Sequence, residues 1–299
     1  MTTKAGAIGP SAASARTRFL HSNRYRVERE WKRYEGTPQR ELFRSLRERF
    51  ILRHAGRVAW AIDIGSGPGR FTRWLGPPGT RTVALDFSRV SLAYLTEWWP
   101  RGDRAPPAPD RVRADGGRPP FLPRSFGTVA VLGNSLGFAG SSSDSVLAAA
   151  SELVAPGGRL LLEFAPGPGE RSRYLARLPA TAVGRLLEAP IRALLPRIQR
   201  EGFHAEPVRK SLPGPFRRIA AGPMGDRLRE GGWQVLETVA VAPALGPDAD
   251  RIASVQSHPR AWDHLLELEE EIGRDALRWT SAASVLLAAE RRACDNTIN

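Results

Sequence analysis

A strand pattern that runs directly into a glycine-rich loop constrains the fold of this chain more than any other feature. The continuous apolar run at 58–62 is typical of a strand in a parallel sheet that is covered on both faces. The sequence D-I-G-S-G-P-G follows at 63–69, and a short apolar helix pattern follows at 71–75. This order of strand, turn and helix predicts that the loop lies at the carboxyl edge of the sheet, where open α/β sheets bind ligands.

Strand-like and helix-like segments alternate along the rest of the chain. Short apolar runs predict further strands at 82–85, 111–114, 128–132, 159–164, 233–241 and 282–289. Helical spacing of apolar residues predicts helices at 40–53, 143–154, 223–231 and 259–273. Because strands that alternate with helices are joined by right-handed crossovers, we expect an α/β fold with helices on both faces of a mainly parallel sheet.

The glycine loop departs from the loop that binds dinucleotide pyrophosphates. That fingerprint requires its third glycine at the position of Arg70. Three carboxylates instead follow the first three strands. Asp86 is placed to accept both hydroxyls of a ribose, Asp115 to meet an adenine edge, and Asp63 to hold loop amides or a cationic amino group. Three acids disfavour a pyrophosphate and favour a nucleoside that carries positive charge.

With these motifs the chain resembles the class I S-adenosylmethionine-dependent methyltransferases. The loop at 63–69 is similar to their first motif, L-D-F-S at 85–88 to the acidic motif after strand two, and A-D-G at 114–116 to the third motif. L-V-A-P-G-G at 153–158 is similar to the L-x-P-G-G sequence before strand five. The family usually has Asp where this chain has Gly127. The resemblance covers residues 58–165 and implies a seven-stranded Rossmann-like sheet.

The resemblance also implies S-adenosyl-L-methionine as the cofactor, together with a set of residues that bind it. These residues are Asp63, Gly65, Ser66, Gly67, Gly69, Asp86, Phe87, Asp115, Gly116, Asn134 and Ser135. The alternatives are helix capping or exposure for Asp86 and Asp115, and turn formation for Asn134 and Ser135. V-L-G-N-S-L-G-F at 131–138 is similar to the segment after strand four in glycine N-methyltransferase-type enzymes, which favours a small-molecule acceptor.

Five segments are expected along the chain. They are a disordered tail at 1–18, a helical cap at 19–57, the cofactor-binding half at 58–165, a basic insertion at 166–222, and closing helices and strands at 223–299. The family commonly builds its substrate cap from the N-terminal helices and the insertion after strand five. The candidates for substrate binding are Tyr25, Trp31 and Tyr34 in the N-terminal cap and Phe138 after strand four, with core packing as the alternative for the aromatic residues of the cap.

The two cap segments carry most of the positive charge. The net charge is +13; residues 1–57 contain 14 basic and 5 acidic residues, and residues 170–232 contain 13 and 6. Such a cap favours an anionic acceptor, either a carboxylate- or phosphate-bearing metabolite or RNA. The alternative is a solvated arginine-rich surface with intrahelical pairs, as the spacing of Glu41, Arg44, Arg47 and Glu48 suggests. The acidic run at 267–271 is expected to be a solvated helix face.

Cysteine usage and hydropathy set further expectations. Cys294 is the only cysteine, so no disulfide can form within this sequence, which fits a reducing, cytoplasmic setting. No apolar run approaches the ~18 residues that a membrane helix needs. No H-x-x-x-H or H-E-x-x-H pair of metal ligands is present. We therefore expect no membrane segment and no metal, and the oligomeric state stays open.

Methyl transfer from a sulfonium requires alignment of the nucleophile more than acid–base chemistry. A base would assist a hydroxyl nucleophile. By position, the candidates are Glu163 at the end of strand five and His204 in the insertion. The favoured alternative for both residues is a structural role. The sequence predicts a methyltransferase that acts on an N or O atom of a small, anionic or neutral molecule. An RNA methyltransferase is the second hypothesis, and a non-catalytic nucleoside-binding protein or NAD(P)-binding oxidoreductase is the third.

Overall fold

The structure is a computed structural model that describes residues 24–100, 106–166, 217–241, 249–276, 279, 282 and 284–292. The predicted tail at 1–18 and most of the predicted insertion at 166–222 lie outside these residues. Seven strands form one sheet: β1 (Trp60–Ile64), β2 (Arg81–Asp86), β3 (Asp110–Arg113), β4 (Phe126–Val131), β5 (Val154–Phe164), β6 (Trp233–Ala240) and β7 (Val285–Arg291).

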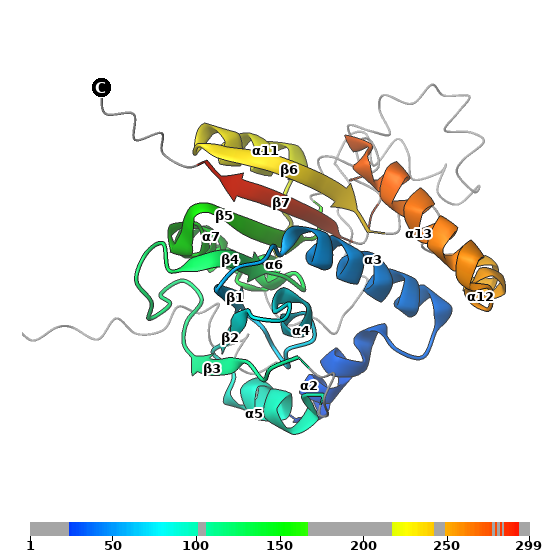
Figure 1. Ribbon diagram of the computed structural model, residues 1–299, viewed down its shortest axis with the longest axis horizontal. Coiled ribbons are helices and arrows are strands. Elements are labelled where there is room, and N and C mark those ends of the chain that lie inside the picture. The colour runs from blue at the N-terminus through cyan, green and yellow to red at the C-terminus, as the bar shows by residue number, and fades with distance from the viewer. Residues whose placement is uncertain are drawn as a thin grey trace, which may run out of the picture.

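The strands lie in the order β3-β2-β1-β4-β5-β7-β6 (Figure 1). Neighbours from β3 to β5 pair in parallel, whereas β7 runs antiparallel to both β5 and β6. The chain moves outward from β1 to β3 and then returns to the other side of β1 as β4, so the strand order reverses between β1 and β4. The predicted seven-stranded Rossmann-like α/β fold is confirmed, and the reversal marks the place where such sheets bind ligands.

Helices cover both faces of the sheet. The longer ones are α2 (Arg24–Trp31), α3 (Pro38–His54), α5 (Arg89–Trp98), α7 (Ser143–Leu153), α11 (Ala221–Glu230), α12 (Ala249–Gln256) and α13 (Pro259–Arg274). Short helices are η1 (Lys32–Tyr34), α4 (Thr72–Leu75), α6 (Ser135–Phe138) and η2 (Gly140–Ser142). Each strand alternates its side chains between the two layers, which is why the central strands are apolar on both faces.

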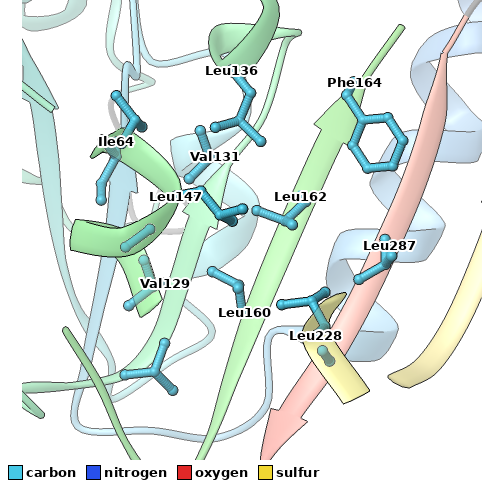
Figure 2. Close-up of a cluster of buried hydrophobic side chains, with 14 of the residues drawn as sticks. Ile64, Val129, Val131, Leu136, Leu147, Leu160, Leu162, Phe164, Leu228 and Leu287 are labelled. Carbon is cyan, nitrogen blue, oxygen red and sulfur yellow. The ribbon is translucent and has the colours of Figure 1, made fainter. Parts of the chain in front are cut away.

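The two faces of the sheet pack against different helices. On one face, side chains such as Val129 and Leu160 meet Leu147 of α7 and Leu228 of α11, as Figure 2 shows. On the other face, small residues such as Ala61 and Ala130 accommodate α3, α4, α12 and α13. Leu42, Leu46, Phe50 and Ile51 of α3 are all buried there, as the helical pattern at 40–53 predicts.

The ends of several elements follow from local hydrogen bonds. Thr37 caps α3 by accepting from Arg40 N at 3.3 Å, and Ser88 caps α5 by accepting from Ser91 N at 3.1 Å. Strand β5 begins at Val154 rather than at the predicted position 159, because Val154 pairs with Phe126 before the register shifts. The short α12 is not predicted from the sequence, since two helical turns give too little periodicity.

Candidate functional site

The glycine loop at 65–69 leaves β1 at the point where the strand order reverses. Gly65 N and Ser66 N both donate to Leu85 O, at 2.8 and 3.1 Å, and Gly69 N donates to Ser66 O at 3.0 Å. These bonds hold the loop against the carboxyl end of β2. The predicted position of the loop at the carboxyl edge of the sheet is therefore what the structure shows.

Two of the loop glycines are required by close approach as well as by backbone conformation. Gly65 has φ +73°, and a Cβ there would lie 2.8 Å from Ser135 Oγ. Gly69 has φ +84°, and a Cβ there would lie 2.4 Å from Leu95 Cδ1. Gly67 has φ +55° but meets no atom within 4 Å, so its Cβ position faces open space. The loop is thus packed at both ends and open in the middle.

Replacing Gly69 with Ala is expected to destabilise the protein more than replacing Gly67 with Ala. Both variants force a side chain into a positive φ, but only the first meets a packed neighbour, Leu95. We expect the free energy of unfolding to fall by ~1 kcal/mol for Gly67→Ala and by ~3 kcal/mol for Gly69→Ala. Denaturant unfolding of the two matched variants measures the difference. Equal losses would show that the contact with Leu95 does not matter.

Asp86 organises the glycine loop directly. Its buried carboxylate accepts from Gly67 N at 2.8 Å through Oδ2 and from Ser88 N at 2.7 Å through Oδ1. One side chain therefore fixes both the middle of the loop and the start of α5. The spacing of the sequence predicts Asp86 at this edge but not these two amide contacts. The predicted contact with ribose hydroxyls stays a prediction.

Asp63 is a buried carboxyl group beneath the loop, with 2 % of its surface exposed. Thr72 Oγ donates to Asp63 Oδ2 at 2.7 Å. Burial raises the pKa of Asp63 to about 7; the Thr72 hydrogen bond opposes this rise, and the charge of nearby Asp86 adds to it. Near neutral pH this group is therefore balanced between its two protonation states, and a cation placed beside it would favour the charged state.

The segment after β4 lies against the glycine loop. Ser135 Oγ donates to Gly65 O at 3.0 Å, so the predicted cofactor-binding residues Ser135 and Gly65 are in contact. Gly133 and Asn134 have φ +64° and +63°, which gives two successive left-handed residues. Asn134 Oδ1 is buried and has no hydrogen-bond partner among the described residues. Most buried amide oxygens accept a hydrogen bond, so we expect a donor from outside those residues.

Glu163 is fully buried at the end of β5. Arg47 donates to Glu163 Oε1 from Nε at 3.0 Å and from Nη2 at 2.7 Å, and Gly133 N donates to Oε2 at 2.9 Å. Burial favours a higher pKa for Glu163, but the charge and hydrogen bonds of Arg47 outweigh it and hold the pKa below its usual range. This geometry favours the structural alternative for Glu163 over a general base. His204, the other candidate base, lies outside the described residues.

The role of Arg47 differs from the sequence prediction. Arg44 forms the predicted intrahelical pairs with Glu41 at 2.6 Å and Glu48 at 3.7 Å. The prediction was wrong for Arg47, whose side chain is 3 % exposed and turns inward to Glu163. Arg47 and Thr72 are thus site residues that the sequence did not reveal.

The remaining predicted residues occupy varied positions. Asp115 is exposed and accepts from Gly117 N at 2.8 Å, and a Cβ on Gly116 would lie 2.8 Å from Ile64 Cγ2. Phe87 and Phe138 are half-buried. Their predicted contacts with a cofactor or substrate stay predictions.

The N-terminal aromatic residues lie on α2 and η1. Tyr25 is 65 % exposed. Trp31 is half-buried, with its ring centroid 6.2 Å from that of Tyr94 on α5. Tyr34 is part of η1, and its side chain lies outside what the structure describes. A substrate role for these three residues stays a prediction.

Most arginines of the N-terminal helices that the structure describes have acidic partners. Arg24 pairs with Glu97 at 2.7 Å, and Arg53 pairs with Glu270 at 3.0 Å.

The expectation of a solvated acidic face at 267–271 is wrong in part, because Glu269 and Glu270 are buried. Their side of α13 packs towards α3 and β6.

Arg73 on α4 differs from these paired arginines. It has no hydrogen-bond or ion-pair partner within the described ranges, and its buried Nε is unsatisfied there. Its guanidinium carbon lies 4.7 Å from the ring centroid of Trp74 and 6.0 Å from that of Trp31. Burial lowers the pKa of Arg73. Arg73 therefore provides a cation between α2 and α4 whose charge no described carboxylate neutralises by contact.

None of the helices in the described part of the chain has both the length and the apolar content to cross a membrane. No group of three or more His, Cys, Asp or Glu side chains in this part could hold a metal ion.

Comparisons with known proteins agree with this geometry. Residues 62–162 match a family model described as a methyltransferase domain. Magnesium protoporphyrin IX methyltransferase from Synechocystis, solved with S-adenosylhomocysteine, is similar in structure, with a TM-score of 0.54, 13% identity and coverage of 93% of this chain and 99% of that one. A didemethyltoxoflavin N-methyltransferase from Burkholderia thailandensis has a TM-score of 0.51, 14% identity and coverage of 97% and 93%. A search of curated proteins finds no match.

Proposed function

We propose that this chain transfers a methyl group from S-adenosyl-L-methionine to a nitrogen or oxygen atom of a small molecule, since residues 62–162 match a methyltransferase domain. The observation that carries the proposal is the glycine loop at the reversal of strand order, held in shape by Asp86 and underlain by Asp63. A loop of this shape beside two buried carboxylates suits a ligand that combines a nucleoside with positive charge.

The residues at this edge of the sheet fit S-adenosyl-L-methionine in three respects. The middle of the loop at Gly67 faces open space, which leaves room for a ligand. Asp63 gains its negative charge most readily beside a cation, and the ligand carries an ammonium and a sulfonium. Asn134 Oδ1 offers an acceptor that no described residue uses. A dinucleotide fits less well, because its pyrophosphate would approach two carboxylates without the glycine that Arg70 replaces.

When bound, this cofactor supplies a methyl group that is already activated on a sulfonium. The protein then has to hold the donor and the nucleophile in line, which can contribute ~7–11 kcal/mol to lowering the barrier. The loop contacts of Asp86 and Ser135 hold the donor side of this arrangement. Glu163 is committed to Arg47, so an acceptor with a neutral nitrogen lone pair, which needs no base, suits the described residues best.

Arg73 supports an acceptor that carries an anionic group. It lies between Trp31 and Trp74 on the side of the loop where the N-terminal helices pack. A carboxylate or phosphate on the acceptor would supply the anionic partner that this cation lacks among the described residues. The other described arginines of α2 and α3 are largely paired with acids, which weakens the case for RNA.

Isothermal titration with S-adenosylhomocysteine, NAD and NADP tests the cofactor. We expect binding of S-adenosylhomocysteine in the micromolar range and no binding of the dinucleotides. Incubation of the protein with methyl-labelled S-adenosyl-L-methionine and a cell extract then tests the acceptor, with label expected in the small-molecule fraction. Binding of NAD would contradict the proposal, label in RNA would favour the RNA hypothesis, and binding without transfer would favour a non-catalytic protein.

A further inference from the structure

A buried network joins α3 and β5 to the turn that follows β4. Arg47 on α3 is separated from Glu163 by 116 residues, yet two of its nitrogens contact Glu163 Oε1. Arg47 Nη2 also donates to Ser284 Oγ at 2.8 Å, and Nη1 donates to Phe43 O at 2.8 Å. The donors of Arg47 are thus largely occupied, so its guanidinium is held rigidly behind Glu163.

The second oxygen of Glu163 reaches a different part of the chain. Glu163 Oε2 accepts from Gly133 N at 2.9 Å, at the first of the two left-handed residues after β4. A Cβ on Gly133 would lie 3.2 Å from the ring of Phe71, so this turn is also packed against the segment that leads into α4. Two consecutive residues with positive φ, one of them Asn134, are costly for a backbone to hold and require such restraints.

The turn places the Asn134 carboxamide beside the glycine loop. The next residue, Ser135, donates to Gly65 O, so the two loops are directly bonded. Asn134 Oδ1 is buried but lacks a donor among the residues that the structure describes. An amide oxygen buried at the edge of a ligand-binding loop without a donor is expected to receive one from the ligand.

We propose that Glu163, paired with Arg47, is a positioning residue: it fixes the turn at Gly133 so that the Asn134 carboxamide oxygen accepts a hydrogen bond from an N–H or O–H of the bound ligand. The inference rests on the proposed function. The donor belongs either to the ammonium of the cofactor or to the methyl acceptor, which share this chemistry, and the experiment below separates the two sources.

The experiment compares two double variants that differ only in the acceptor for Gly133 N. Arg47→Met/Glu163→Gln removes both charges but keeps a side-chain carbonyl that can accept from Gly133 N. Arg47→Met/Glu163→Leu removes both charges and the acceptor. Neutralising both partners avoids an unpaired buried charge, so both variants are expected to fold. We expect the Gln variant to keep its affinity for S-adenosylhomocysteine and its rate of methyl transfer within about threefold of the wild type. We expect the Leu variant to lose about tenfold or more in one of these two quantities.

Asn134→Gly tests the carboxamide itself. Glycine adopts a positive φ without strain, so this variant keeps the turn and removes only the side chain. If Glu163 acts through Asn134, adding Asn134→Gly to the Arg47→Met/Glu163→Leu variant causes little further loss, because both changes remove the same interaction. Additive losses would show that the Arg47–Glu163 pair acts independently of Asn134 and would overturn the proposal.

Two measurements on Asn134→Gly identify the donor. A weaker affinity for S-adenosylhomocysteine assigns it to the cofactor, whereas unchanged affinity with at least tenfold less label in the acceptor pool assigns it to the acceptor. If neither changes, the proposal is wrong. Glu237→Gln serves as a control. Glu237 lies on β6, the edge strand at the opposite end of the sheet from β3, and forms ion pairs with Arg53 of α3 and Arg274 of α13. This variant should alter stability but not affinity.

Failure of the wild type to bind S-adenosylhomocysteine would contradict the proposed function rather than the role of Glu163.

Discussion

Replacing Asp63 with Asn is expected to stabilise the protein at pH 8 while weakening its affinity for S-adenosyl-L-methionine. The pKa of Asp63 is about 7 in the folded protein against 3.8 for an ordinary Asp, because the carboxyl group is buried. At 1.36 kcal/mol for each pKa unit, keeping this group charged in the fold costs on the order of 4 kcal/mol above pH 7. Asn avoids this cost, and its amide oxygen can still accept the hydrogen bond from Thr72.

The pH dependence of stability follows from the same shift. Between pH 4 and pH 7 the folded protein retains a proton on Asp63 that the unfolded chain has lost, so the wild type becomes less stable as the pH rises through this window. The Asn variant lacks this contribution. Denaturant unfolding at pH 5 and pH 8 measures the difference, with Asp226→Asn as a control, because the Asp226 side chain is 68% exposed. Identical pH slopes for wild type and Asp63→Asn would contradict the prediction.

The predicted loss of affinity in Asp63→Asn has a distinct signature. S-adenosyl-L-methionine carries a sulfonium that S-adenosylhomocysteine lacks, so removal of the carboxylate should weaken the first ligand more than the second. For the wild type we expect the affinity for S-adenosyl-L-methionine to rise as the pH increases through 7 and Asp63 loses its proton. An equal change for both ligands would show that Asp63 does not sense the sulfonium and would contradict the prediction.

The grouping of the candidate cofactor-binding residues could be predicted because it follows one rule of the fold. Residues that come directly after parallel strands meet at the same edge of the sheet, so Gly65, Asp86 and Ser135 could be grouped from their places in the sequence alone. The rule gives positions but not partners. It could not tell that Asp86 would hold the amides of Gly67 and Ser88.

The Arg47–Glu163 pair could not be predicted for a different reason. Helical spacing allows Arg47 to pair within α3, and a contact across 116 residues leaves no local pattern. One signal was available, since Arg47 lies one turn from both Phe43 and Phe50 and so falls on the apolar side of the helix. Similarly, a Cβ on Gly127 would lie 2.6 Å from Val58, a contact that only the fold reveals.

Replacing Asp86 with Ala is expected to lower the affinity for S-adenosylhomocysteine by about a hundredfold or more. The change removes the acceptor for Gly67 N in the open middle of the loop and the acceptor for Ser88 N at the start of α5. Two amides then lose charge-assisted hydrogen bonds worth ~1.5–3 kcal/mol each, and the predicted ribose contact is lost with them. About 2.7 kcal/mol is already a factor of one hundred in affinity.

Two further variants separate the roles of Asp86. In Asp86→Asn the carboxamide can accept from one amide but presents its own N–H groups to the other, so this variant should bind more weakly than the wild type despite its similar shape. Asp226→Ala is the control, because the Asp226 side chain is 68% exposed, pairs with Arg229 on α11 and is not among the predicted cofactor-binding residues, so the affinity should not change. If Asp86→Ala folds and binds within threefold of the wild type, the two amide contacts of Asp86 do not support ligand binding, and the prediction is wrong.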